Sequence, residues 1–228
     1  MRFCPASDQC MLVYLGEHIS VPAHERVLQL LRRLQRHPPA WLRNLQPAYT
    51  SLMVTFDPCV VDHAGVETAL RRFDDQQKPA RPHKPRIVQI PVCYGGEFGP
   101  DLEDIARAIR MKPTQFIQLH SSRTYHAYFL GFAPGFAYLG DVPEKIAVPR
   151  LQAPRRVVPA GSVGIAGKQT AVYPFATPGG WVLIGRTPVA VFRPNRKPMQ
   201  LISIGDQVKF RPISAEEFRK MEAAWPRC

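Results

Sequence analysis

The chain has 228 residues, of which 45% are apolar, so it can bury one large core or two small ones. Its formal net charge of +12 makes an acidic partner or a nucleic acid a candidate ligand. Basic residues are spread along the sequence, which weakens the case for nucleic acid. No apolar run approaches the about 18 residues of a membrane span, and the first residues lack the apolar core of a signal peptide.

The cysteines are odd in number and show no paired C-x-x-C spacing. They are Cys4, Cys10, Cys59, Cys93 and Cys228. This pattern predicts neither a disulfide framework nor a zinc site, and we expect no metal centre. A chain with free thiols and no signal peptide is expected to be cytoplasmic.

The first third of the sequence predicts a small α+β domain. Its expected elements are a strand at 10–15, a helix after Ser20 and Pro22, strands at 41–47 and 50–56, a helix capped by Asp62, and a strand at 86–92. The order β-α-β-β-α-β is typical of the ferredoxin-like arrangement, in which two helices cover a four-stranded antiparallel sheet. Periodicity alone leaves open whether residues 86–92 join this sheet or the next domain.

A polar segment rich in proline and basic residues, DDQQKPARPHKPR at 74–86, follows the second predicted helix. Such a composition is typical of an exposed linker. We therefore expect a first domain over residues 1–86, with the linker at its end, and a second domain over residues 87–228.

Two short helices are predicted at 101–110 and 114–120, separated by Pro113. The pair has the outline of a helix-turn-helix, so DNA binding is an alternative function on a basic protein. The second helix carries no lysine or arginine, however, and we consider nucleic acid an improbable partner.

From Tyr125 onward, short apolar runs bounded by glycine and proline predict a β-barrel or β-sandwich, closed by a helix at 215–224. The stretch 128–188 is dense in glycine, proline and aromatic residues. Proline fixes the backbone and glycine allows close approaches, so this composition predicts a rigid, pre-formed pocket.

Arg186 is the candidate cation of this pocket, because a guanidinium can bind a carboxylate or phosphate at two points. A structural ion pair is the open alternative. Backbone amides in the glycine-rich segment 161–167 could hold an oxyanion. His120 is a candidate for proton transfer, and Ser162 is interpreted as a turn residue rather than a nucleophile. The residues expected to contact substrate are Phe132, Pro134, Gly135, Phe136, Tyr138, Gly161, Ser162, Gly167, Gln169, Thr170, Gly179, Gly180, Trp181 and Thr187.

At these residues the chain resembles the family of 5-oxoprolinase B-type subunits, also called KipI-like kinase inhibitors or allophanate hydrolase subunit 1. The matching segments are IPVCYGGEFGPDLEDIA at 90–106, YFLGFAPGFAYLG at 128–140, PRLQAPRRVVPAGSVGIAGKQTAVYP at 149–174 and PGGWVLIGRTP at 178–188. The resemblance implies a ferredoxin-like N-terminal domain followed by a cyclophilin-like β-barrel.

The resemblance also implies an activity, the ATP-dependent opening of 5-oxoproline to glutamate, with Mg²⁺ as the counter-ion of ATP. It implies a C-type partner of related barrel fold and a third, A-type component. Arg186 and His120 are then the expected catalytic residues, and a carboxylate and a phosphate the expected ligands. The alternatives are a regulatory protein that inhibits a sensor histidine kinase and a subunit of an allophanate hydrolase-type amidase.

Overall fold

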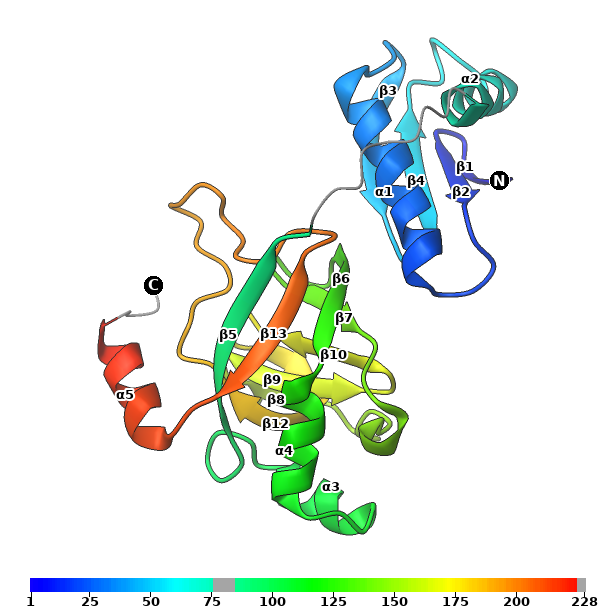
Figure 1. Cartoon of the computed structure of the whole chain (residues 1–228). Coiled ribbons are helices and arrows are strands. Elements are labelled where there is room, and N and C mark those ends of the chain that lie inside the picture. The colour runs from blue at the N-terminus through cyan, green and yellow to red at the C-terminus, as the bar shows by residue number, and fades with distance from the viewer. Residues whose placement is uncertain (76–84, 225–228) are drawn as a thin grey trace. The chain divides into compact units, whose positions relative to one another are not determined.

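The computed structural model describes residues 1–75 and 85–224. Most of the predicted linker, at 76–84, and Cys228 lie outside the described residues. The chain divides into two compact units, residues 1–84 and residues 85–228 (Figure 1). Across the described ranges, no helix is long and apolar enough to cross a membrane.

The first unit is an antiparallel sheet with two helices. The strand order is β1-β2-β4-β3, and the elements are β1 (Arg2–Ser7), β2 (Cys10–Tyr14), α1 (Val21–Arg36), β3 (Leu42–Pro47), β4 (Ser51–Phe56) and α2 (His63–Asp75). In β2 and β4 every second residue is buried, as expected for a sheet with one covered face. The Ser20 hydroxyl accepts a hydrogen bond from the Ala23 amide at 3.3 Å and so caps α1.

The fourth strand of this sheet is β1, and not the predicted strand at 86–92. Residues 86–92 instead contribute to β5 of the second unit, which decides the point that periodicity left open. The first unit therefore begins with a β-hairpin and has the order ββαββα. Sequence reasoning missed β1 because Pro5 interrupts its short pattern, and proline is tolerated there only because β1 is an edge strand.

The second unit is a closed seven-stranded barrel with the order β10-β7-β6-β13-β5-β12-β9, beside a two-stranded ribbon of β8 and β11. Its strands are β5 (Ile87–Tyr94), β6 (Thr124–Leu130), β7 (Ala137–Gly140), β8 (Arg155–Val158), β9 (Ser162–Ala166), β10 (Gln169–Val172), β11 (Thr177–Gly179), β12 (Val182–Arg186) and β13 (Gln207–Pro212). The first and last of them, β5 and β13, pair in parallel from Ile87 opposite Gln207 to Val92 opposite Pro212. The prediction of a turn-rich β-structure from Tyr125 onward is confirmed as a barrel.

Helices lie against this barrel. They are α3 (Leu102–Ala108), α4 (Pro113–Ser122), the short 3₁₀ turn Glu144–Ile146 and α5 (Ala215–Ala224). The pair predicted at 101–110 and 114–120 is present as α3 and α4. The helix α4 packs on β13, and its buried residues Phe116 and His120 face the barrel core. The predicted closing helix is confirmed as α5, whose Phe218 is buried against β5.

Candidate functional site

A cavity of about 380 Å³ opens in the second unit beside the β8–β11 ribbon. Its volume falls within the roughly 300–1,000 Å³ that is usual for small-molecule sites. The lining residues are Phe132, Phe136, Tyr138, Arg150, Leu151, Gln152, Pro154, Tyr173, Gly179, Gly180 and Trp181. Aromatic rings with a single arginine therefore dominate the wall.

The aromatic rings of the wall pack edge to face. Phe136 lies 5.3 Å from Tyr173 and 5.5 Å from Trp181 between ring centroids, with interplanar angles of 77° and 84°. This is a favoured geometry for ring pairs, so the inner wall is rigid. Phe132 differs because its side chain is 60% exposed and its backbone has a φ of +68°, which places a ring at the mouth of the cavity.

Two glycines shape this wall. A Cβ at Gly179 would lie 2.5 Å from the Tyr173 hydroxyl oxygen, so any larger residue would push into the buried ring. Gly135 has a φ of +81°, and a Cβ there would lie 2.5 Å from the Cβ of Phe192. Glycine is therefore required at 179 to keep the Tyr173 ring in the wall and at 135 to let the neighbouring loop pack on Phe192.

Arg150 is the cation of the cavity wall, and its side chain is exposed. Burial raises the pKa of the Tyr138 hydroxyl, and the positive charge of Arg150 offsets part of that rise. Both side chains line the cavity. A guanidinium next to a phenol provides donors for a small anion such as a carboxylate.

A second arginine holds the wall in place. One nitrogen of Arg155 lies 2.5 Å from Asp101 Oδ1, and the other donates to the Trp181 carbonyl at 3.4 Å. Asp101 Oδ2 also accepts a hydrogen bond of 2.7 Å from the Leu183 amide. Asp101 therefore joins the start of α3, the β8–β11 ribbon and β12, and it fixes the strand that follows Trp181.

Six residues predicted from the sequence line the cavity, namely Phe132, Phe136, Tyr138, Gly179, Gly180 and Trp181. Sequence reasoning missed Arg150, Leu151, Gln152, Pro154 and Tyr173, although these residues stand in the segment 149–174 that carries the family resemblance. The proline-flanked arginine at the start of that segment was the available signal. Eight other predicted contacts lie outside the lining: Pro134, Gly135, Gly161, Ser162, Gly167, Gln169, Thr170 and Thr187.

Arg186, the predicted cation, is also not part of the cavity wall. Its Nε donates to the Ala160 carbonyl at 2.9 Å, and its Nη2 lies 3.9 Å from Glu222 Oε1 on α5. Both contacts are structural, in agreement with the alternative of a structural ion pair that the sequence left open for Arg186. Its catalytic role stays a prediction.

The amides of Gly161 and Gly167 do not form the expected oxyanion site. Gly161 donates to the Tyr173 carbonyl at 2.7 Å, and Gly167 donates to the Val148 carbonyl at 2.6 Å. Each amide therefore already has a backbone acceptor. The glycine-rich sequence here serves turns with positive φ, at +80° and +57° respectively, rather than an anion nest.

His120, the predicted proton-transfer residue, is fully buried in the barrel core. Its Nε2 lies 3.1 Å from Thr170 Oγ1, and Thr170 donates its own proton to the Gly164 carbonyl at 2.9 Å. Nε2 is therefore the donor and Nδ1 accepts from the Tyr94 hydroxyl at 2.8 Å. Burial lowers the pKa of His120 to about 3, so the imidazole is neutral at physiological pH. This geometry assigns His120 to the core and not to the cavity.

The sequence matches the family described as carboxyltransferase domain, subdomain C and D, over residues 1–202. The chain belongs to this family. A relative from Bacillus subtilis (strain 168), named as the B-type subunit of 5-oxoprolinase, is 42% identical over 225 residues and the match covers 92% of each chain. A protein of the same name from Haemophilus influenzae is 39% identical, with 92% of this chain and 97% of that one covered.

Solved structures share the fold of this member of the carboxyltransferase domain family. TTHA0988 has a TM-score of 0.80 and 34% identity over 92% of the chain, and the chain corresponds to only 41% of its length. PH0987 from Pyrococcus horikoshii is 44% identical over 95% of the chain and all of its own length, with a TM-score of 0.57. Urea carboxylase of Kluyveromyces lactis has a TM-score of 0.75 at 18% identity, which shows likeness of fold alone.

Proposed function

We propose that the chain is the B-type subunit of an ATP-dependent 5-oxoprolinase and that its aromatic cavity binds the lactam substrate. The curated relatives that carry the name of this 5-oxoprolinase component support the first part of the proposal. The observation that carries the site is Arg150 in a wall that contains five aromatic rings. A flat apolar ring with one carboxylate matches such a wall, because the rings pack on the lactam and the guanidinium binds the carboxylate.

The lactam amide is a poor electrophile, and transfer of the γ-phosphoryl group of ATP to its carbonyl oxygen, with release of ADP, activates the carbon. Water then adds to that carbon, and the ring C–N bond breaks as the nitrogen leaves with a proton as the amine. A second water releases phosphate from the resulting acyl phosphate and leaves glutamate. In this scheme the aromatic wall excludes bulk water and Arg150 orients the substrate by its carboxylate.

The proposed enzyme has a C-type partner of related barrel fold and an A-type third component, and it works in the cytoplasm with Mg²⁺ bound to ATP. The kinase-inhibitor and allophanate-hydrolase alternatives are not favoured by the names of the curated relatives. We further propose that the first unit is a ferredoxin-like variant with β1 in the place of a C-terminal fourth strand, and that the barrel is cyclophilin-like.

The test is turnover by the assembled enzyme. The chain is co-expressed with its companion subunits, supplied with 5-oxoproline and ATP, and glutamate and ADP are measured. Arg150→Ala is expected to raise KM for 5-oxoproline by about 10- to 100-fold, since a charge-assisted hydrogen bond contributes about 1.5–3 kcal/mol. Arg156→Ala is the matched control, because Arg156 is an exposed arginine on β8 that does not line the cavity.

Two results would contradict this assignment. An assembled enzyme that forms neither glutamate nor ADP would end the 5-oxoprolinase proposal. If Arg186→Ala abolished turnover while Arg150→Ala left KM unchanged, the anion site would lie beside Ala160 and not in the cavity.

A further inference from the structure

The segment between β12 and β13 contains an arm, residues 191–201, that we call the basic arm. Its two limbs pair with each other: Leu201 donates to the Val191 carbonyl at 2.8 Å, and Arg193 donates to the Met199 carbonyl at 2.7 Å. Phe192 and Gln200 form a β-bridge between the limbs. Figure 1 shows the orange loop between these strands projecting from the barrel.

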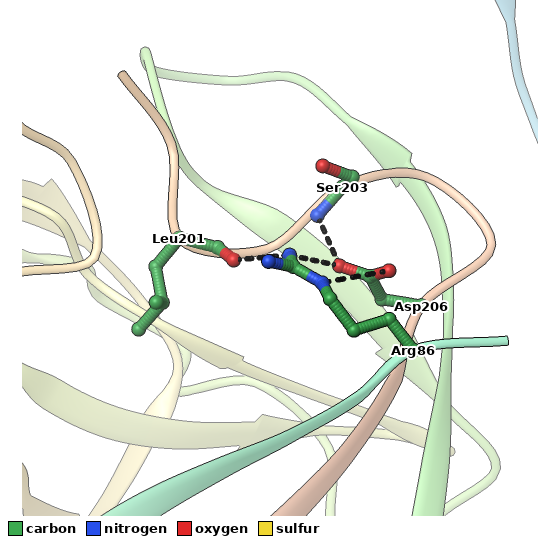
Figure 2. Close-up of polar contacts among 4 residues, drawn as sticks. All are labelled: Arg86, Leu201, Ser203 and Asp206. Atoms are coloured by element: carbon green, nitrogen blue, oxygen red, sulfur yellow. Dashed lines mark hydrogen bonds and ion pairs between the residues drawn. The ribbon is translucent and has the colours of Figure 1, made fainter. Parts of the chain in front are cut away.

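The base of the basic arm is braced by charged hydrogen bonds (Figure 2). The Arg86 guanidinium donates to the Leu201 carbonyl at 2.6 Å and to Asp206 Oδ2 at 2.5 Å. The Asp206 side chain is 9% exposed and also accepts from the Ser203 amide at 2.8 Å. Charge-assisted bonds of this kind are strong, so the arm leaves the barrel in a defined direction.

The tip of the basic arm carries charges without opposite charges beside them. The side chains of Arg196 and Lys197 are exposed, and neither makes an ion pair with any residue in 1–75 or 85–224. Met199 adds an apolar side chain that is 49% exposed, and methionine suits adaptable binding surfaces.

The basic arm is also continuous with the cavity mouth. Phe192 at its base packs so closely on Gly135 that a Cβ on the glycine would lie 2.5 Å from the Phe192 Cβ. Gly135 belongs to the loop that carries Phe132, whose ring is 60% exposed at the mouth. The base of the arm therefore packs on the loop that carries Phe132.

We propose that the basic arm docks on an acidic surface of a companion subunit, and that docking brings this companion over the cavity mouth. The proposal rests on the proposed function, since a multi-subunit enzyme supplies the companion. Unpaired cations on a braced arm favour an acidic partner because complementary charge speeds association and fixes orientation. The exposed Phe132 and Met199 give the contact an apolar part.

The experiment measures binding of the full-length chain to its co-expressed companion subunits. The arm variant is Arg196→Glu with Lys197→Glu. Its matched control is Lys145→Glu with Lys209→Glu, two exposed lysines of the same unit that give the same change in net charge. The arm variant is expected to weaken binding at least tenfold at about 50 mM salt, with a smaller difference at about 500 mM because salt screens exposed charges. The control variant is expected to bind like the parent chain.

Equal binding by the arm variant and the parent chain would overturn the proposal, as would equal weakening by the control. The same holds if only binding to duplex DNA, or only binding to vesicles rich in phosphatidylserine, depends on the arm. Turnover separates this proposal from the proposed function: a parent complex that assembles through the arm but forms no glutamate refutes the function and leaves the docking intact. A parent chain that captures no companion refutes both.

Discussion

Asp101 is the residue whose removal tests the structural account of the cavity most directly. Its carboxylate accepts from the Leu183 amide at 2.7 Å and pairs with Arg155 at 2.5 Å. We predict that Asp101→Ala destabilises the barrel unit by about 3 kcal/mol, whereas Asp101→Asn costs about 1 kcal/mol.

These magnitudes follow from the two contacts. Leu183 is 2% exposed, and a buried amide left without its acceptor costs about 1–3 kcal/mol. The side chains of Arg155 and Asp101 are 29% and 16% exposed, so their ion pair contributes about 1–2 kcal/mol. In Asp101→Asn the single amide oxygen can still accept from the Leu183 amide, and only the ion pair and hydrogen bond with Arg155 are lost.

The assay is urea unfolding of the full-length chain, with thermal unfolding as a second probe. A loss of about 3 kcal/mol lowers the Tm of a unit of this size by about 6–12 °C. The predicted role of Asp101 is refuted if Asp101→Ala lowers the free energy of unfolding by less than about 1 kcal/mol, or if the alanine and asparagine variants lose the same stability. Either result would mean that the Leu183 hydrogen bond contributes little to stability.

The remaining predictions concern His120 and the cavity glycines. The folded chain holds His120 with a pKa of about 3 against an ordinary value of 6.5, so the unfolded chain takes up the proton first and stability falls as pH drops below 6.5. Between pH 6.5 and 5 the free energy of unfolding should fall by about 2 kcal/mol because of this group. Urea unfolding at both pH values should show that His120→Gln lacks this loss, and an equal loss of stability in the variant and the parent chain would contradict the prediction. Gly179→Ala should destabilise by about 1–3 kcal/mol by displacing the Tyr173 ring, and Gly180→Ala, whose Cβ would meet its nearest atom at 3.6 Å, should be nearly neutral. Thermal unfolding compares the two variants, and equal shifts would show that the ring is not confined as described.

Local patterns predicted the elements of the fold better than their pairing. The strand at 10–15 and the helices at 101–110 and 215–224 were recognisable because apolar spacing and turn residues act over a few neighbours. The partner of residues 86–92 could not be read in this way, since β5 pairs with β13 about 120 residues later, as Ile87 opposite Gln207 shows. Pairing at that distance is decided by packing of the whole barrel.

The candidate site was also predicted only in part, because its local composition can be read from the sequence but the packing that brings its residues together cannot. Glycine and aromatic residues indicated a rigid pocket, and Gly179 with Trp181 does line it. Arg186 was predicted as the cation of the pocket, whereas the wall carries Arg150, because sequence spacing does not show which loop residues meet the cavity. His120 was equally ambiguous until its two ring nitrogens were seen to be paired in the core.

The parallel pairing of β5 with β13 has a consequence for synthesis of the protein. In the barrel order β13 stands between β6 and β5, so the first strand of this unit has no neighbour on that side until the last strand arrives. On the ribosome the sheet must remain open, with an unpaired edge, until residues near Pro212 have emerged from the exit tunnel. A chain that terminated before that point would keep the open edge and be prone to edge-to-edge association. The C-terminal strand β13 therefore closes the barrel last.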